Sequence, residues 1–152
     1  MKVFAVLFVL LAQSACGKSV IDDDPSGPVT QAPPASQAQV DALGGLRDGD
    51  TLGPARVIRV AEIYRGMMPV EVEVAGARST LTVCLFSEQG PAPPVRTERY
   101  AIYWGSGSPG TKSVPNDALM ATTEALAARI RKVEATVTPP KGVTQYVMEK
   151  KP

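Results

Sequence analysis

Histidine is absent from this chain of 152 residues, and cysteine occurs only twice. Without histidine there is no Ser-His-Asp triad, no Cys-His dyad and no imidazole acid–base catalyst, and the common nitrogen ligand of zinc is missing. Two cysteines are too few for a four-cysteine metal site or a disulfide framework. We therefore expect no metal and no other cofactor.

An excess of charge of either sign is also missing. The 16 basic and 15 acidic residues give a formal net charge of +1, and loss of a leader that contains Lys2 would leave 15 of each sign. Nucleic-acid binding needs a basic surface that displaces counterions, and long-range attraction to anionic surfaces needs an unbalanced charge. The composition therefore argues against a nucleic-acid partner.

The first 15 residues have the pattern of an export signal. Lys2 precedes an unbroken apolar run of ten residues, 3–12. As a helix this run would span about 15 Å, which is half of the ~30 Å hydrocarbon core of a bilayer. A basic residue followed by a short apolar run is typical of a secretory signal peptide. We predict that residues 1–15 are this signal peptide and that the protein is exported.

The residues after the apolar run carry a family resemblance. Ser14, Ala15, Cys16 and Gly17 resemble the lipobox of bacterial lipoproteins, although Gln13 stands where that family usually has an aliphatic residue. The resemblance covers only about the first 17 residues. It implies that the leader is removed, that Cys16 becomes the lipid-modified first residue, and that lipid anchors the protein to the cell membrane or the outer membrane. The rest of the chain would then lie in the periplasm or the extracellular space.

Residues 16–45 are predicted to be the attachment cysteine followed by a disordered tether. Residues 17–35 are rich in proline, serine and aspartate, and such a segment cannot bury enough apolar surface to offset the entropy lost on ordering. Residues 22–24 are three aspartates, which lack the ligand spacing of a calcium loop and indicate a solvated charge run.

A short helix is expected over residues 36–43 near the end of this tether. Ser36 and Gln39 have the spacing of a capping box, and residues 44–45 are two glycines that would stop the helix. A helix this short is not stable alone, so Val40 and Leu43 would have to rest on the folded domain.

Residues 46–149 are predicted to form one domain, with residues 150–152 as a tail. Hydrophobic periodicity and turn residues indicate an α+β fold, in which one main helix packs on one face of an antiparallel sheet of four to five strands. The expected order is β-β-β-β-α-β, with strands at 55–64, 70–75, 79–86, 97–104 and 143–148 and the helix at 116–133.

The hairpin of residues 70–86 has the clearest pattern. A type II′ turn at residues 76–77 would pair Val72 with Leu81 and give one apolar and one polar face. Glu71 and Glu73 fall on the polar face, where a solvated surface is favoured over an acid–base pair. Cys84 shares that face, and we expect it to be a partly covered, unreactive thiol because no basic neighbour lowers its pKa.

The candidate binding residues surround the Gly/Ser-rich segment 105–113. They are Tyr103, Trp104, Ser106, Ser108 and Lys112. The segment differs from a phosphate-binding loop because Thr111 separates Gly110 from the lysine, so we expect no nucleotide. Aromatic and cationic residues on a loop are common contact residues in interfaces. The alternative is a flexible connection from strand to helix.

We expect the protein to be a non-enzymatic module of the cell envelope. It would bind an envelope protein or a cell-wall component, with the membrane as its partner through the lipid. One alternative is a secreted inhibitor of a hydrolase that acts through the loop 105–112. Another is a small hydrolase that uses a serine of this loop with Lys112, a pair that would need a desolvated lysine.

Overall fold

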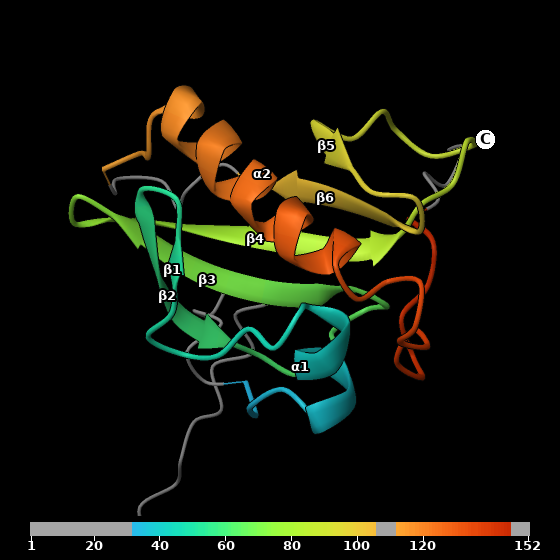
Figure 1. The fold of residues 1–152 in the computed structure, drawn as a ribbon. Helices are drawn as coiled ribbons and strands as arrows, with labels where there is room; N and C mark the ends of the chain where they lie inside the picture. Colours follow the sequence, from blue (N-terminus) through green and yellow to red (C-terminus); the bar gives the residue numbers. More distant parts are fainter. Residues whose placement is uncertain (1–31, 106–111, 147–152) are drawn as a thin grey trace, which may run out of the picture.

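The computed structural model describes residues 32–105 and 112–146. Within these residues it contains one antiparallel sheet of six strands and two helices. In chain order the elements are α1 (Gln37–Ala42), β1 (Thr51–Leu52), β2 (Ala55–Val60), β3 (Met68–Val74), β4 (Ala77–Leu85), β5 (Val95–Arg96), β6 (Tyr100–Trp104) and α2 (Asn116–Arg131). The strands lie side by side in the order β1-β2-β3-β4-β6-β5 (Figure 1).

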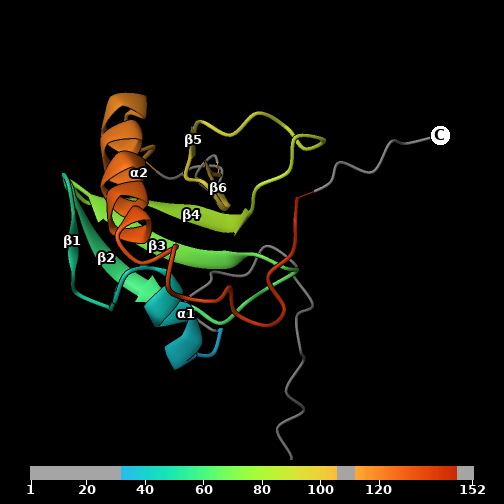
Figure 2. The ribbon, with the colours of Figure 1, turned by 45° about the vertical axis from the view of Figure 1, so that its right-hand side comes forward.

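Helix α2 lies across one face of the sheet (Figure 1 and Figure 2). It contacts β1 at one edge of the sheet and β5 at the other. One helix can touch both edge strands only if the sheet curls toward it. The predicted α+β arrangement, an antiparallel sheet with one main helix on one face, is confirmed.

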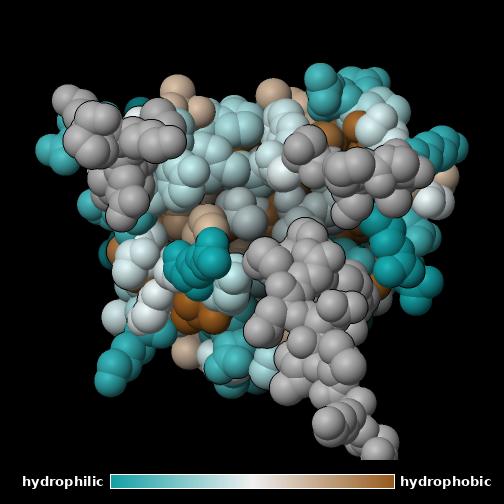
Figure 3. Space-filling view, turned by 180° about the vertical axis from the view of Figure 1, so that it is seen from behind, coloured by the Kyte–Doolittle hydropathy of each residue, from teal (hydrophilic) through white to brown (hydrophobic). Residues whose placement is uncertain are grey.

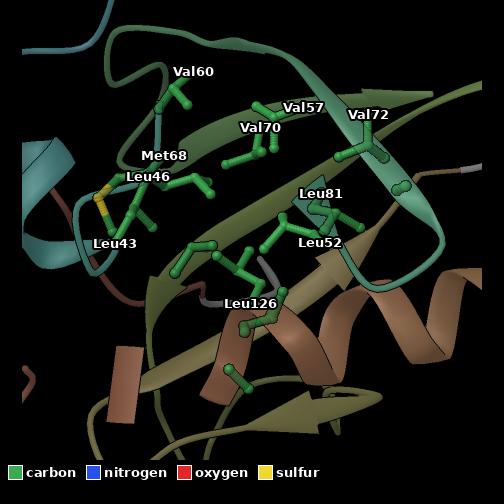
Figure 4. Close-up of a cluster of buried hydrophobic side chains, with 14 of the residues drawn as sticks. Leu43, Leu46, Leu52, Val57, Val60, Met68, Val70, Val72, Leu81 and Leu126 are labelled. Carbon is green, nitrogen blue, oxygen red and sulfur yellow. The ribbon is translucent and has the colours of Figure 1, made fainter. Parts of the chain in front are cut away.

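The core fills the space between α2 and the sheet. Leu126 and Ile130 of α2 are fully buried, as are Met68 and Val70 of β3. Figure 4 shows side chains of β1, β2, β3 and β4 and of the segment after α1 converging here. The labelled members are Leu43, Leu46, Leu52, Val57, Val60, Met68, Val70, Val72, Leu81 and Leu126. The strand and helix periodicities of the sequence meet in this one cluster.

The predicted strand order β-β-β-β-α-β needs correction. Four of the expected strands are present as β2, β3, β4 and β6, whereas β1 and β5 are two-residue strands that are too short to produce a periodic pattern. The prediction of a strand at 143–148 is wrong. Residues 143–146 make a single bridge, from Gln145 to Leu85, and residues 147–148 lie outside the described residues. The backbone of Thr144 bonds instead to Gly66 and Leu85, at the tip of one hairpin and the end of β4.

The turn between β3 and β4 lies one residue earlier than predicted. Ala75 and Gly76 have φ angles of 49° and 78°, and positive values at both central positions are typical of a type I′ turn. Val72 consequently pairs with Ser79, not with Leu81. The pairing moved by two residues, which is the period of a strand, so the apolar and polar faces are those that were predicted.

The outer face of the sheet is less solvated than predicted. Glu71 is only 7% exposed, and Arg78 reaches the carboxylates of Glu71 and Glu73 at 3.3 and 3.4 Å. Cys84 is fully buried, with its sulfur 3.9 Å from the carbonyl oxygen of Ala101. Burial raises the pKa of the Cys84 thiol, which disfavours the reactive thiolate.

The short helix α1 forms with the capping box that the sequence predicted. The backbone N–H of Gln39 donates to Ser36 Oγ, and the backbone N–H of Ser36 donates to Gln39 Oε1. Val40 and Leu43 are buried against the domain as expected. Gly44 permits this close packing, because a Cβ there would stand 2.7 Å from the carbonyl oxygen of Arg129.

Residues on the N-terminal side of α1 also join the sheet. Pro34 forms an antiparallel bridge with Ala61, and the N–H of Ala35 donates to the carbonyl of Val60. The domain was expected to begin at Leu46. The folded body therefore also includes residues that precede Leu46. The carbonyl of Pro33 accepts from the N–H of Glu62, and the prolines at 33 and 34 are accommodated because neither has to donate a hydrogen bond at this edge.

Helix α2 begins at Asn116, with Pro115 as its N-cap. No side-chain hydrogen bond caps it. The rigid φ angle of proline suits the first turn of a helix, and Asp117 adds a negative charge near the positive end of the dipole.

The buried hydroxyl of Tyr100 should destabilise the folded state. Tyr100 is 1% exposed, and its hydroxyl has no hydrogen-bond partner among the described residues; burial raises the pKa of this phenol. We expect Tyr100→Phe to raise the free energy of unfolding by about 1 kcal/mol, measured by urea denaturation, because it removes an unsatisfied polar group. The control is Tyr103→Phe, which loses a 2.7 Å hydrogen bond to the carbonyl of Pro91 and should be destabilised. A loss of stability in Tyr100→Phe would contradict the prediction.

The ion pair that joins α2 to the turn before β1 should make stability depend on pH. Arg129 donates to Asp50 Oδ2 at 2.7 Å and holds the pKa of that carboxyl below its ordinary value of 3.8. The folded state therefore binds this proton less readily than the unfolded state. The stabilisation is present above pH 3.8 and is lost as the pH falls through the lower folded pKa. A double-mutant cycle of Asp50→Asn and Arg129→Gln should give about 1 kcal/mol at pH 7 and a value that shrinks below pH 4. A coupling that stays constant down to pH 2 would rule this out.

Candidate functional site

The structure describes three of the five predicted binding residues, Tyr103, Trp104 and Lys112. Tyr103 and Trp104 are neighbours in β6 and point to opposite faces of the sheet, as their alternation requires. Trp104 packs against the core beneath α2. Lys112 is exposed, and Ser106 and Ser108 lie outside the described residues.

Tyr103 contacts the proline-rich loop 86–94. Its hydroxyl donates to the carbonyl of Pro91 at 2.7 Å, and its ring lies 5.6 Å from that of Tyr146. Burial raises the pKa of the Tyr103 phenol, so the hydroxyl keeps the proton that this bond uses. The proline-rich loop 86–94 is thereby fixed to the outer side of β6.

This loop and the segment after it border two adjoining hollows. The first, of about 490 Å³, is lined by Phe86, Ser87, Glu88, Gly90, Pro91, Ala92, Pro93, Pro94 and Arg96. The second, of about 510 Å³, is lined by Phe86, Arg96, Thr97, Glu98, Arg131 and Glu134. Because both hollows share Phe86 and Arg96, we describe them together as the Phe86–Arg96 groove. Its size is that of sites which bind small molecules or short peptide segments.

The loop that forms one wall of the groove is rigidly held. Three of its residues are prolines at positions 91, 93 and 94, which limits the backbone conformations it can adopt. The side-chain amide of Gln145 donates to the carbonyl of Phe86, and a Cβ on Gly90 would stand 2.6 Å from the carbonyl oxygen of Tyr146. The groove is therefore largely preformed, which lowers the entropy cost of binding.

A buried carboxylate organises the other wall. Glu134, just beyond the end of α2, is 6% exposed. Its carboxylate accepts hydrogen bonds from the Thr97 hydroxyl at 2.7 Å and from the backbone N–H groups of Arg99 and Glu98 at 3.2 and 3.4 Å. These bonds fix the turn from β5 to β6, and they occupy the carboxylate with protein donors.

Arg96 is the charged group best placed to meet a ligand. Its guanidinium stacks over the Phe86 ring, 4.6 Å from the ring centroid. No hydrogen bond or ion pair within residues 32–105 and 112–146 uses this guanidinium. Arg131 lies beside it and donates to the backbone carbonyl of Arg96 at 2.9 Å. A cation held on an aromatic ring in this way keeps its N–H groups oriented and available.

The remaining surface offers weaker candidates. The large exposed apolar side chains of the described residues are far apart in the chain: Tyr64 lies between β2 and β3, Met120 lies in α2, and Tyr146 follows α2. Seen from behind, the molecule shows hydrophobic colour only in small patches between hydrophilic residues (Figure 3). Among the described residues, no group of three or more potential ligands could hold a metal ion. The Phe86–Arg96 groove is therefore the candidate site.

The chain was compared with protein-family models, curated proteins and solved structures. No protein-family model, no curated protein and no solved structure matches the chain significantly.

Sequence reasoning missed this groove for an identifiable reason. Phe86 ends the strand predicted at 79–86 and Arg96 directly precedes the strand predicted at 97–104, with a proline-rich segment between them. Glu134 lies almost forty residues beyond Arg96. The cluster of prolines was the one signal of a fixed loop. Nothing in the spacing of these residues indicates that Phe86 and Arg96 stack.

Glu134 can be tested as the support of the groove. Glu134→Gln replaces one acceptor oxygen with an amide that faces backbone or hydroxyl donors, so we expect the free energy of unfolding to fall by about 2 kcal/mol. The matched control is Glu124→Gln, which removes only an exposed pair with Arg131 at 3.6 Å and should cost less than about 1 kcal/mol. Thermal or urea denaturation measures both. Equal costs in the two variants would contradict the role given to Glu134.

Proposed function

We propose that this protein is an exported, lipid-anchored module of the cell envelope that binds a protein or a cell-wall component and does not catalyse a reaction. The observation that carries the proposal is the leader, in which Lys2 and a ten-residue apolar run are followed by Cys16. Cys16 is the proposed site of lipid attachment.

Two features of the structure support a binding role. The folded body carries a preformed groove with an aromatic residue, prolines and charged side chains on its walls. The buried carboxylate beside it, Glu134, already accepts three hydrogen bonds from the protein, which suits a structural role better than proton transfer.

No helix of the described residues is long and apolar enough to cross a bilayer.

The anchor is tested by removing one cysteine at a time. Cys16→Ala should move the protein from the membrane fraction to the soluble envelope fraction, because the lipid attachment would be lost. The matched control is Cys84→Ala, which removes the buried cysteine and should leave the protein in the membrane fraction. Fractionation followed by detection of the full chain makes the comparison, and a metabolic fatty-acid label should appear in Cys84→Ala but not in Cys16→Ala. Membrane retention of Cys16→Ala would overturn the proposed anchor.

A further inference from the structure

We propose that the Phe86–Arg96 groove binds the peptide stem of the cell wall, with the Arg96 guanidinium receiving a carboxylate of that peptide. This inference rests on the proposed function, because it assumes that the folded body faces the cell wall. It narrows that function to one ligand class and one receiving group.

The position of Arg96 is the first reason. Its side chain contributes to both hollows of the groove, and Phe86 supports one face of the guanidinium at 4.6 Å. The planar guanidinium presents a fork of N–H donors that matches a carboxylate in a bidentate arrangement. Arg131 brings a second positive charge to the same wall.

The balance of charges is the second reason. Glu88 lines the first hollow and Glu98 the second, and both side chains are exposed. Neither carboxylate takes part in a hydrogen bond or ion pair with another described residue. The groove therefore presents cationic and anionic groups together. Such a surface complements a ligand that carries both carboxylates and an amino group, and it disfavours polymers of a single charge.

The apolar part of the lining is the third reason. The walls include Pro91, Pro93, Pro94 and the Phe86 ring, which offer flat apolar contact to an extended chain. A cell-wall stem peptide is short, is extended, and carries free carboxylates; many stems also carry a free amine. It therefore meets the charged and the apolar groups of the groove at once.

Binding can be measured with the soluble disaccharide-tetrapeptide that a muramidase releases from cell-wall sacculi. The full chain, purified in detergent, should bind this ligand in a calorimetric or fluorescence titration. Arg96→Ala should weaken binding at least about tenfold, because a charge-assisted contact to a carboxylate is lost. Arg96→Lys keeps the charge without the planar fork, so its affinity should lie between those of the wild-type protein and Arg96→Ala.

The matched control is Arg56→Ala, which removes another exposed arginine from β2, near the edge of the sheet opposite β5. It should bind as the wild-type protein does. The same disaccharide-tetrapeptide with its carboxylates converted to amides should lose most of its affinity. Thermal denaturation should show that Arg96→Ala is folded, since Arg96 is exposed.

Three results would overturn the inference: no binding by the wild-type protein, equal binding by wild type and Arg96→Ala, or equal binding of an unrelated acidic tetrapeptide. The last would identify the groove as a general acidic-peptide site. None of these results changes the outcome of the Cys16→Ala fractionation, so failure of the ligand and failure of the anchor remain distinguishable.

Discussion

The packing of α2 into the curl of the sheet is the interaction on which the other features depend. Leu126 and Ile130 are fully buried between the two layers, and the helix reaches the strands at both edges. A single helix can cover a sheet of this width only when the sheet bends around it. The bend and the helix thus stabilise each other through one continuous apolar cluster.

The position of α2 also decides where the groove forms. Its C-terminal end carries Arg131 and is followed by Glu134, and both side chains extend to the segment between β5 and β6. Their hydrogen bonds fix the turn that holds Arg96 over Phe86. A rigid helix end supports one wall, and a loop stiffened by prolines forms the other.

The two ends of the described chain reinforce this arrangement. At the N-terminal end, residues 33–35 bond to residues 60–62 at the end of β2, and α1 packs against the domain through Val40 and the adjoining Leu43. At the C-terminal end, residues 143–146 join the β2–β3 hairpin to the loop after β4 through Gly66 and Phe86. Segments without regular secondary structure therefore connect parts of the fold that the strands alone leave apart.

The sequence alone predicts the α+β class, four strands, the main helix and the capped short helix, because these depend on local periodicity and on spacing between near neighbours. The alternation in 70–75 indicated the buried face even though the turn was placed one residue late. Long-range packing accounts for the left-handed conformation of Ala75, the burial of Glu71 and Cys84, and the absence of a strand at residues 143–146. It also brought Phe86, Arg96 and Glu134 to one surface. These outcomes depend on contacts between residues far apart in the chain, and no local pattern encodes which distant partner a side chain meets.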